Sequence, residues 1–291
     1  MILLLGALLA AAYYYYFYVP RAAPPPLAGS YSQGRLMTAA GVREFYWYQP
    51  RELPRDAALV VVLHGSGSSG AQVRASAGYE FDIEADRHGL LVAYPDGYQQ
   101  HWNDCRKDAD YAANRENIDD VGFLRQMIQW FVSERGIDPR RVFVSGHSNG
   151  GHMAFRLALE APELVRGIAP ISANLPSPES MGCFQSGEPV SVAIFNGTAD
   201  PINPYEGGLV EVLGNTSRGV VLSALETAEY WNRLAGISGS AEVTHYPELD
   251  GRPETSVVIV VQVIIPPAVN QNAFALKAGG QFGAIEPVRP G

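Results

Sequence analysis

The sequence is poor in cysteine and lacks the motifs by which proteins usually hold metal ions. Its 291 residues include two cysteines, with no C-x-x-C pair, no cluster of histidine and cysteine, and no H-E-x-x-H. We therefore predict no metal site. Internal repeats and basic runs are also lacking, and the net charge of −9 argues against a nucleic-acid partner. The 47% of hydrophobic residues suffices for the core of one globular domain.

Charged side chains are missing from residues 1–19 at the start of the chain. Residues 2–12 are strongly apolar, and the tyrosines and phenylalanine at 13–18 suit a membrane interface. No lysine or arginine precedes the apolar run, so a signal peptide and an N-terminal membrane anchor both remain open. A proline-rich linker completes the segment 1–26. We expect the following domain to be secreted, periplasmic or anchored on the outer side of a membrane.

The most informative motif is Gly146–Gly150 (GHSNG), which matches G-x-S-x-G. In α/β-hydrolases this motif forms the nucleophile elbow, a tight turn between a strand and a helix. Residues 141–145 predict a short buried strand, and residues 151–160 predict a helix. The glycines allow strand and helix to approach closely. We predict that Ser148 is a catalytic nucleophile; the alternative is an ordinary turn with an incidental serine.

A glycine-rich loop follows the apolar strand predicted at 59–63. An acyl-transfer serine needs two N–H groups directed at the developing oxyanion. We expect one from the backbone of Asn149 and the other from Ser66 or Gly67. The loop lacks the G-K-[ST] of phosphate-binding loops, and we expect no cofactor. We expect His64 to brace this loop rather than to act as a base.

An acidic residue follows a third apolar strand, predicted at 189–195. α/β-hydrolases keep the chain order serine, acid, histidine. Asp200 lies far enough after Ser148 for one more helix and strand. We predict that Asp200 is the acid of a catalytic triad; the alternative is a turn-forming Asp-Pro pair.

Taken in order, these motifs resemble the polyhydroxybutyrate-depolymerase and feruloyl-esterase group of α/β-hydrolases. The similarity covers roughly residues 58–210 and rests on the segments Leu63–Gly65, Tyr94–Gly97 with Trp102–Asp104, Asp119–Leu124, Gly146–Gly151, and Asn196–Pro201 with Pro204–Gly208. The resemblance implies a secreted serine ester hydrolase acting through an acyl-enzyme, with Ser148 as nucleophile and Asp200 as acid. It also implies a triad histidine in a glycine-rich turn after the last strands.

The triad histidine is missing from its expected place. The chain has six histidines, namely His64, His88, His101, His147, His152 and His245, and no glycine-rich turn with a histidine follows Asp200. His245 alone follows Asp200, in a segment at 241–246 that predicts a strand. We take His245 as the candidate base; the alternative is a partly exposed strand histidine. In that case the chain is a catalytically impaired or binding-only homologue.

The composition changes near residue 258. Residues 255–265 form a long apolar run, followed by two prolines and a tail rich in glycine, alanine, asparagine and glutamine. We therefore assign residues 27–258 to the esterase domain. Residues 259–291 are expected to be an atypical tail, either aberrant, disordered or divergent.

Two pairs of residues extend the predicted site. Trp102 and Asn103 follow a strand in a polar loop, and we expect them to line the substrate mouth; the alternative is a core tryptophan under the loop. Cys105 and Cys183 lie in loops expected on the same side of the sheet. An exported protein meets oxidising conditions, so they form either a disulfide or two isolated thiols.

Strands that alternate with helices indicate an α/β fold with a doubly wound, mostly parallel sheet. We predict strands at 59–63, 90–94, 141–145, 167–171, 189–195 and 241–246, a strand region at 35–48, and helices at 79–87, 121–135, 151–160 and 221–234. Asp119 and Asp120 are expected to begin the helix at 121–135. The site should lie beyond the carboxyl ends of the strands.

Three function classes remain open. The first is a serine esterase acting on small or polymeric carboxylic esters. The second is a non-enzymatic binder of such esters, or an impaired enzyme. The third is a serine peptidase of the same fold.

Overall fold

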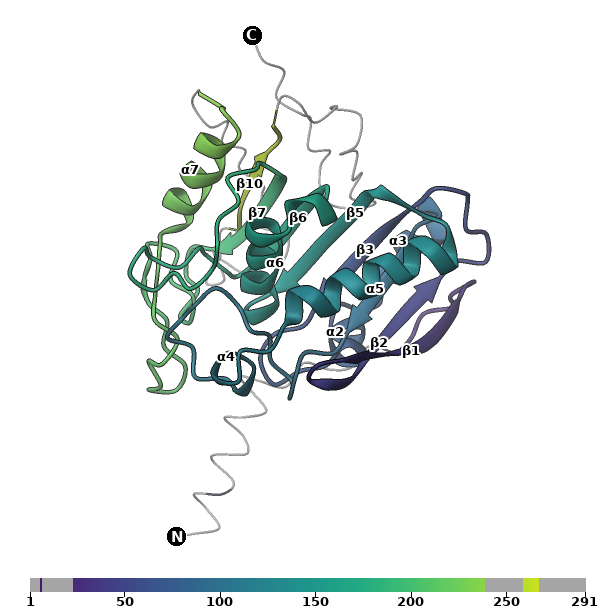
Figure 1. Ribbon diagram of the computed structural model, residues 1–291, viewed down its shortest axis with the longest axis horizontal. Coiled ribbons are helices and arrows are strands. Elements are labelled where there is room, and N and C mark those ends of the chain that lie inside the picture. Colours follow the sequence, from purple (N-terminus) through teal and green to yellow (C-terminus); the bar gives the residue numbers. More distant parts are fainter. Residues whose placement is uncertain (1–5, 7–22, 239–258, 267–291) are drawn as a thin grey trace.

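A computed structural model describes Gly6, residues 23–238 and residues 259–266 (Figure 1). Within these ranges an eight-stranded sheet has the order β1-β2-β4-β3-β5-β6-β7-β10. Its strands are β1 (Ser30–Thr38), β2 (Gly41–Gln49), β3 (Ala57–Leu63), β4 (Leu91–Pro95), β5 (Ile137–His147), β6 (Gly167–Ile171), β7 (Ser191–Gly197) and β10 (Ile259–Ile264). The short strands β8 (Gly208–Leu209) and β9 (Val220–Val221) form a separate pair.

The helices follow the strands in alternation. They are α2 (Gly70–Ser76), α3 (Glu80–His88), α4 (Ala112–Arg115), α5 (Asp120–Arg135), α6 (Asn149–Glu160) and α7 (Ala224–Leu234), with a 3-10 turn at Pro162–Leu164. Asp119 caps α5, because its carboxylate accepts a hydrogen bond from the Gly122 N–H at 2.7 Å. The expected beginning of this helix is therefore correct.

The centre of the sheet is parallel. β3 pairs in parallel with both β4 and β5, and β5, β6 and β7 continue the parallel pairing. The antiparallel hairpin β1–β2 closes one edge through β4, and β10 pairs antiparallel with β7 at the other edge. This topology confirms the predicted mostly parallel α/β sheet.

Side chains of β3 show why helices cover both faces of the sheet. Leu59, Val61 and Leu63 belong to the larger core cluster, together with residues of α5 and α6. Val62 points to the opposite face and joins the smaller cluster with Ala85 of α3. Because alternate side chains of a strand point to opposite faces, a continuous apolar run indicates burial on both sides.

Several elements differ from the sequence-based expectation. The strand region at 35–48 is a hairpin of two strands. The last helix begins at Ala224 rather than Val221, because Ser223 and Glu226 form a capping box, while Val221 pairs in β9. The strand predicted at 241–246 lies outside the described residues.

The sheet also extends past the expected domain boundary at 258. Residues 259–264, assigned from the sequence to an atypical tail, form β10 against β7. Part of the apolar run at 255–265, where the family resemblance stops, thus forms an edge strand of the sheet.

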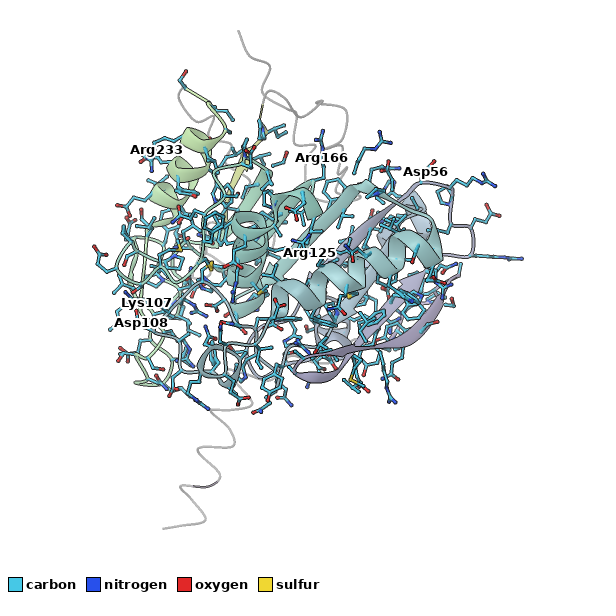
Figure 2. The ribbon with its side chains drawn as sticks, in the orientation of Figure 1. Asp56, Lys107, Asp108, Arg125, Arg166 and Arg233 are labelled. Atoms are coloured by element: carbon cyan, nitrogen blue, oxygen red, sulfur yellow. A yellow bond between two sulfur atoms is a disulfide. The ribbon has the colours of Figure 1, made fainter. Side chains whose placement is uncertain are left out.

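The two ends of the sheet are separated in Figure 2. Asp56 and Arg166 directly precede β3 and β6, so they mark the amino ends of the parallel strands. Lys107 and Asp108 lie at the opposite end, in the loop before α4. The carboxyl ends of β3, β5 and β7 therefore point toward that loop, where ligands bind in folds of this kind.

No helix in the described ranges is both long and apolar enough to cross a membrane. Residues 1–19, for which we predict a signal peptide or an anchor, lie outside those ranges except for Gly6.

Candidate active site

Ser148 lies in a constrained turn between β5 and α6. Its φ of 53° and ψ of −118° place a non-glycine residue in an unfavourable region of backbone space. The turn is held on both sides: the Ser148 N–H donates to Ile171 O at 2.8 Å, and its carbonyl accepts from the His152 N–H at 2.9 Å. Such strain persists only where the surroundings enforce it, and it is frequent at functional sites. The geometry is that of the predicted nucleophile elbow.

The glycines of the motif are required by close contacts. A side chain at Gly146 would collide with the carbonyl group of Gly150, and one at Gly150 would collide with the carbonyl oxygen of Leu63. β3, β5 and α6 therefore meet at backbone contact distance. This contact also brings the loop after β3 to Ser148, since a Cβ placed on Gly65 would lie 3.6 Å from the Ser148 Cβ.

Two N–H groups beside Ser148 have no acceptor in the described part of the chain and can receive an oxyanion. The Asn149 N–H lies in the first turn of α6, where a helix leaves N–H groups without an intrahelical acceptor. Of the two candidates in the loop after β3, Gly67 donates its N–H to Gln100 O at 3.0 Å. No hydrogen bond of the described residues uses the Ser66 N–H. The structure thus favours Ser66 over Gly67.

Residues 65–70 also spell G-x-G-x-x-G, the pattern of dinucleotide-binding loops. In that function the N–H groups of the loop must face a pyrophosphate. Here Gly67 donates to Gln100 O, Gly70 donates to Asp96 Oδ1 at 2.7 Å, and Gln72 donates to Ser69 Oγ at 3.3 Å. These donors are occupied within the protein, so the loop is not arranged to hold a dinucleotide.

His64 braces the loop, as expected. Its Nε2 accepts a hydrogen bond from the Gly97 N–H at 2.9 Å, so the proton resides on Nδ1, which lies 2.7 Å from Gly65 O. Burial lowers the pKa of His64 to about 4. A neutral imidazole with both nitrogens occupied cannot serve Ser148 as a base.

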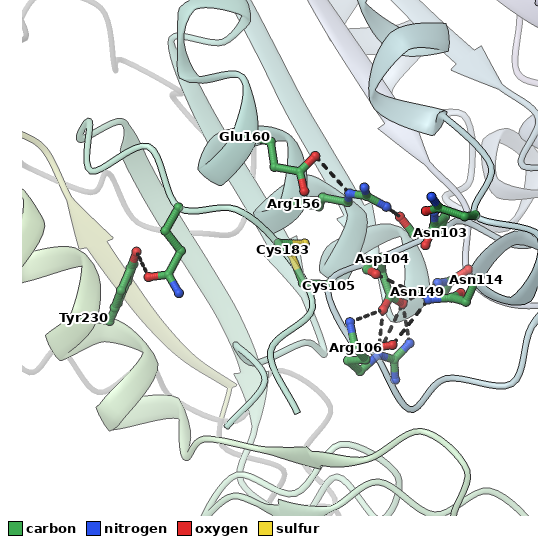
Figure 3. Close-up of a disulfide and its surroundings, with 12 residues drawn as sticks. Asn103, Asp104, Cys105, Arg106, Asn114, Asn149, Arg156, Glu160, Cys183 and Tyr230 are labelled. Carbon is green, nitrogen blue, oxygen red and sulfur yellow. Dashed lines mark hydrogen bonds and ion pairs between the residues drawn. A yellow bond between two sulfur atoms is a disulfide. The ribbon is translucent and has the colours of Figure 1, made fainter. Parts of the chain in front are cut away.

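The side chain of Asn149 ties the elbow to the loop after β4. Its Oδ1 accepts from the Trp102 N–H at 2.8 Å, and its Nδ2 donates to Trp102 O at 3.0 Å and to Asp104 Oδ2 at 2.6 Å. Asp104 in turn forms a buried ion pair with Arg106 at 2.5 Å (Figure 3). Burial alone would raise the pKa of Asp104, but the charge and hydrogen bonds of Arg106 hold it below its usual range.

Cys105 lies between Asp104 and Arg106 and is bonded to Cys183 (Figure 3). The disulfide joins the loop after β4 to the segment before β7, and the two cysteines are 78 residues apart in sequence. Of the two arrangements left open by the sequence, the structure has the disulfide. The Asp104–Arg106 pair was not foreseen, although opposite charges flanking a cysteine in a predicted loop were visible.

The expectation that Trp102 and Asn103 line an open mouth is wrong. Trp102 is fully buried, and its indole N–H donates to His64 O at 3.0 Å. Asn103 is also buried, and its amide donates to Ile118 O at 2.8 Å. The polar loop folds over the indole, so these residues position the loop and do not face solvent.

Asp200 lies in the loop after β7, at the same end of the sheet as Ser148. Its Oδ1 accepts hydrogen bonds from the Ile202 and Asn203 N–H groups, both at 2.9 Å. These bonds orient the carboxylate and leave Oδ2 without a hydrogen bond among the described residues. An oriented carboxylate with one free oxygen suits a partner imidazole.

Four further histidines in the described part of the chain can be assessed as bases. His152 is buried, and burial lowers its pKa to about 3. His101 stacks on the ring of Tyr111, and His88 pairs with Glu84 on α3. Burial lowers the pKa of His147, and the nearby charge of Asp200 raises it by a smaller amount. His245 lies outside the described residues, so its role stays a prediction.

A cavity of about 510 Å³ lies between α7 and the segment that follows β6. Leu175, Met181 and Leu222 supply apolar walls, and Glu226 and Arg233 supply charge. Ser148 and Asp200 are not among the residues that line it, so this cavity is separate from the candidate site.

Comparison with known proteins shows the family of the chain. The family described as phospholipase/carboxylesterase matches residues 51–210, which is more than half of the chain. The protein named "Putative esterase NocK" from Nocardia uniformis subsp. tsuyamanensis is 30% identical over 63% of this chain and 53% of its own. Feruloyl esterase B of Piromyces equi is 28% identical over 52% of this chain and 28% of its own.

Poly(3-hydroxybutyrate) depolymerase of Ralstonia pickettii is 33% identical over 45% of this chain and 28% of its own. The chain thus spans about half the length of NocK and less than a third of the other two relatives. The resemblance to polyhydroxybutyrate depolymerases and feruloyl esterases is confirmed, as is the fold. The chain therefore belongs to the phospholipase/carboxylesterase family of α/β-hydrolases.

Proposed function

We propose that this chain hydrolyses carboxylic esters through Ser148. The observation that carries the proposal is the strained Ser148 turn, beside which the N–H groups of Asn149 and Ser66 have no acceptor among the described residues. A serine presented in this way can attack an ester carbonyl, and two preorganised donors stabilise the negative charge that develops on its oxygen. The proton of Ser148 must pass to a base before the acyl-enzyme forms.

Asp200 is proposed as the acid that orients this base. Its carboxylate is fixed by two backbone N–H groups, and its second oxygen has no hydrogen bond within the ranges that the structure describes. An imidazole held by that oxygen would take the serine proton and later give it to the leaving alcohol. His245 is the candidate, since it alone among the histidines follows Asp200 in the chain.

A second candidate function is ester binding with little turnover. It is favoured by one observation, that His245, the one histidine among residues 201–291, does not lie in a glycine-rich turn. Without a base, kcat is expected to fall by about 10³-fold or more, because only the oxyanion donors and substrate binding remain. The elbow would then still bind esters and transition-state analogues.

We further propose that the protein acts outside the cytoplasm on esters of the kinds named for its relatives. The Cys105–Cys183 disulfide supports export, because disulfides persist in oxidising compartments. The names of two relatives point to hydroxyalkanoate polyesters and feruloyl esters as the first substrates to test.

Turnover of 4-nitrophenyl acetate by the full chain, together with labelling by a fluorophosphonate, tests the proposal. We expect 4-nitrophenolate release and a label on Ser148, located by mass spectrometry of the peptides. A His245→Ala variant separates the two candidate functions. A loss of about 10³-fold in that variant identifies His245 as the base. Slow turnover that His245→Ala leaves unchanged supports the impaired homologue, and the absence of both turnover and label would contradict the assignment.

A further inference from the structure

A tyrosine hydroxyl connects the loop after β3 to an arginine that is distant in sequence. Ser66 Oγ donates a hydrogen bond to Tyr111 Oη at 2.9 Å, and Arg218 Nε donates to the same oxygen at 2.8 Å. Tyr111 is buried, and the ring of His101 stacks on it with 4.4 Å between centroids. One rigid side chain therefore holds the guanidinium of Arg218 beside the loop that packs against Ser148.

The backbone at Arg218 is also held in place. Arg218 lies in the segment between β8 and β9. Val210 donates to Gly219 O at 3.0 Å, and Ser177 donates to Val220 O at 2.9 Å. The φ of Gly219 is +73°, in the region that favours glycine. The position of the arginine is therefore set before any ligand arrives.

The positive charge of Arg218 has no carboxylate partner in the part of the chain that the structure describes. The two arginines that flank Tyr111 in the sequence are neutralised: Arg106 pairs with Asp104, and Arg115 pairs with Asp110. A partly exposed guanidinium without a counter-charge attracts anions, and its fork of donors matches a carboxylate.

The donors of Arg218 are only partly used. Nε binds Tyr111, and Nη1 donates weakly to Asn215 O at 3.3 Å. Nη2 makes no hydrogen bond with the described residues. The acid near this turn, Asp108, accepts from the hydroxyl of Ser180 at 2.8 Å and forms no ion pair with Arg218. One edge of the guanidinium thus remains open.

We propose that Arg218 determines substrate specificity by binding a carboxylate carried by the ester itself. The inference rests on the ester hydrolysis proposed above and specifies its substrate class. The carboxylate would pair with the open edge of the guanidinium, while the ester carbonyl lies at Ser148 and the Ser66 loop. The preferred substrates are then esters that bear a second, ionised acid group a few bonds from the ester bond.

Matched pairs of esters test this specificity. On the acyl side, mono-4-nitrophenyl succinate is compared with 4-nitrophenyl butyrate, which has the same chain length without the charge. On the alcohol side, the butyrate ester of 4-hydroxybenzoate is compared with that of 4-hydroxybenzamide. We expect kcat/KM to favour the anionic member of at least one pair. In Arg218→Gln this preference should fall by about 10-fold to 100-fold, mostly through KM, as expected for a lost charge-assisted bond.

Arg166→Gln is the matched control, since Arg166 lies at the opposite end of the sheet (Figure 2) and pairs with no carboxylate in the described ranges. It should leave the preference unchanged. A preference that is equal in Arg218→Gln and in the parent, or absent from both ester pairs, would overturn the proposal.

A binding measurement separates this inference from the proposed hydrolysis. Monomethyl succinate and methyl butyrate are titrated into the protein while the arginine Nε–H resonances are followed by nuclear magnetic resonance. We expect monomethyl succinate alone to shift one arginine resonance that is missing in Arg218→Gln. Such binding without any ester turnover contradicts the hydrolysis and upholds the carboxylate site. Turnover without such binding contradicts the carboxylate site alone.

Discussion

Two asparagines of the candidate site, one next to Ser148 and one near Asp200, differ in their hydrogen bonding. Asn149, beside the elbow, is fully buried, and both atoms of its amide are hydrogen-bonded, to Trp102 and Asp104. Asn203, beside Asp200, is also buried, but neither its Oδ1 nor its Nδ2 has a partner among the described residues. Buried amides are normally hydrogen-bonded, because an unpaired one loses its hydrogen bonds to water and gains none within the protein.

This contrast separates a completed side of the site from an incomplete one. The elbow side comprises β3, β5, α6 and the loop after β4. Hydrogen bonds of Asn149 join α6 to this loop, and the Cys105–Cys183 disulfide fixes the loop to the segment before β7. The acid side comprises the loop after β7, where one oxygen of Asp200 and the amide of Asn203 have no hydrogen bond within the described part of the chain. Polar groups left open beside a candidate catalytic acid mark the place where the base of the triad is needed.

The largest effect should come from Ser148→Ala, which removes the proposed nucleophilic oxygen from the elbow side. We expect turnover of 4-nitrophenyl acetate to fall by about 10³-fold or more, because removal of one triad member has such an effect elsewhere. The fluorophosphonate label should disappear as well. Ser133→Ala, on the exposed surface of α5, is the control. Unchanged turnover in Ser148→Ala would refute the assignment of the nucleophile.

The elbow side was largely predictable from the sequence, and the reasons are local. The apolar run before Gly65 and the G-x-S-x-G motif at residues 146–150 each depend on neighbouring residues. The burial of Trp102 was not predictable in this way, because a loop that is polar in sequence folds over the indole. The hydrogen bond between Arg218 and Tyr111 joins residues 107 positions apart, and no local sequence pattern predicts it.

Trp102→Ala should destabilise the elbow side of the fold without changing substrate binding. Removal of a fully buried indole should lower the free energy of unfolding by about 3–5 kcal/mol. KM should stay within about twofold, since the ring does not face solvent. Urea denaturation and ester kinetics on the same preparation measure both quantities. A raised KM with undiminished stability would restore the interpretation that Trp102 lines the mouth.

Acid should destabilise the elbow side through His64. Its pKa is about 4 in the folded protein and near 6.5 when unfolded, so the unfolded chain binds the proton first as pH falls. The stability due to neutral His64 is complete above pH 6.5 and is lost as pH falls toward 4, by up to about 3 kcal/mol.

The buried His152, with a pKa of about 3, acts in the same direction and extends the loss to lower pH. Urea denaturation at several pH values between 7 and 4 measures the slope of stability with pH. The slope should be smaller in His64→Gln than in the parent protein. An identical slope in both proteins would show that His64 does not titrate in this range.

The smallest effect is expected from Asn203→Leu on the acid side. A leucine has the same branched arrangement of four side-chain heavy atoms as asparagine, and this change removes two polar atoms that have no partner among the described residues, so the free energy of unfolding should change by less than about 1 kcal/mol. Asn149→Leu is the matched control, because it leaves the buried N–H and carbonyl of Trp102 without partners and removes one hydrogen bond to Asp104, so it should cost about 3 kcal/mol or more. If Asn203→Leu proves as damaging as Asn149→Leu, then the amide of Asn203 has a partner in solution, and the acid side is as complete as the elbow side.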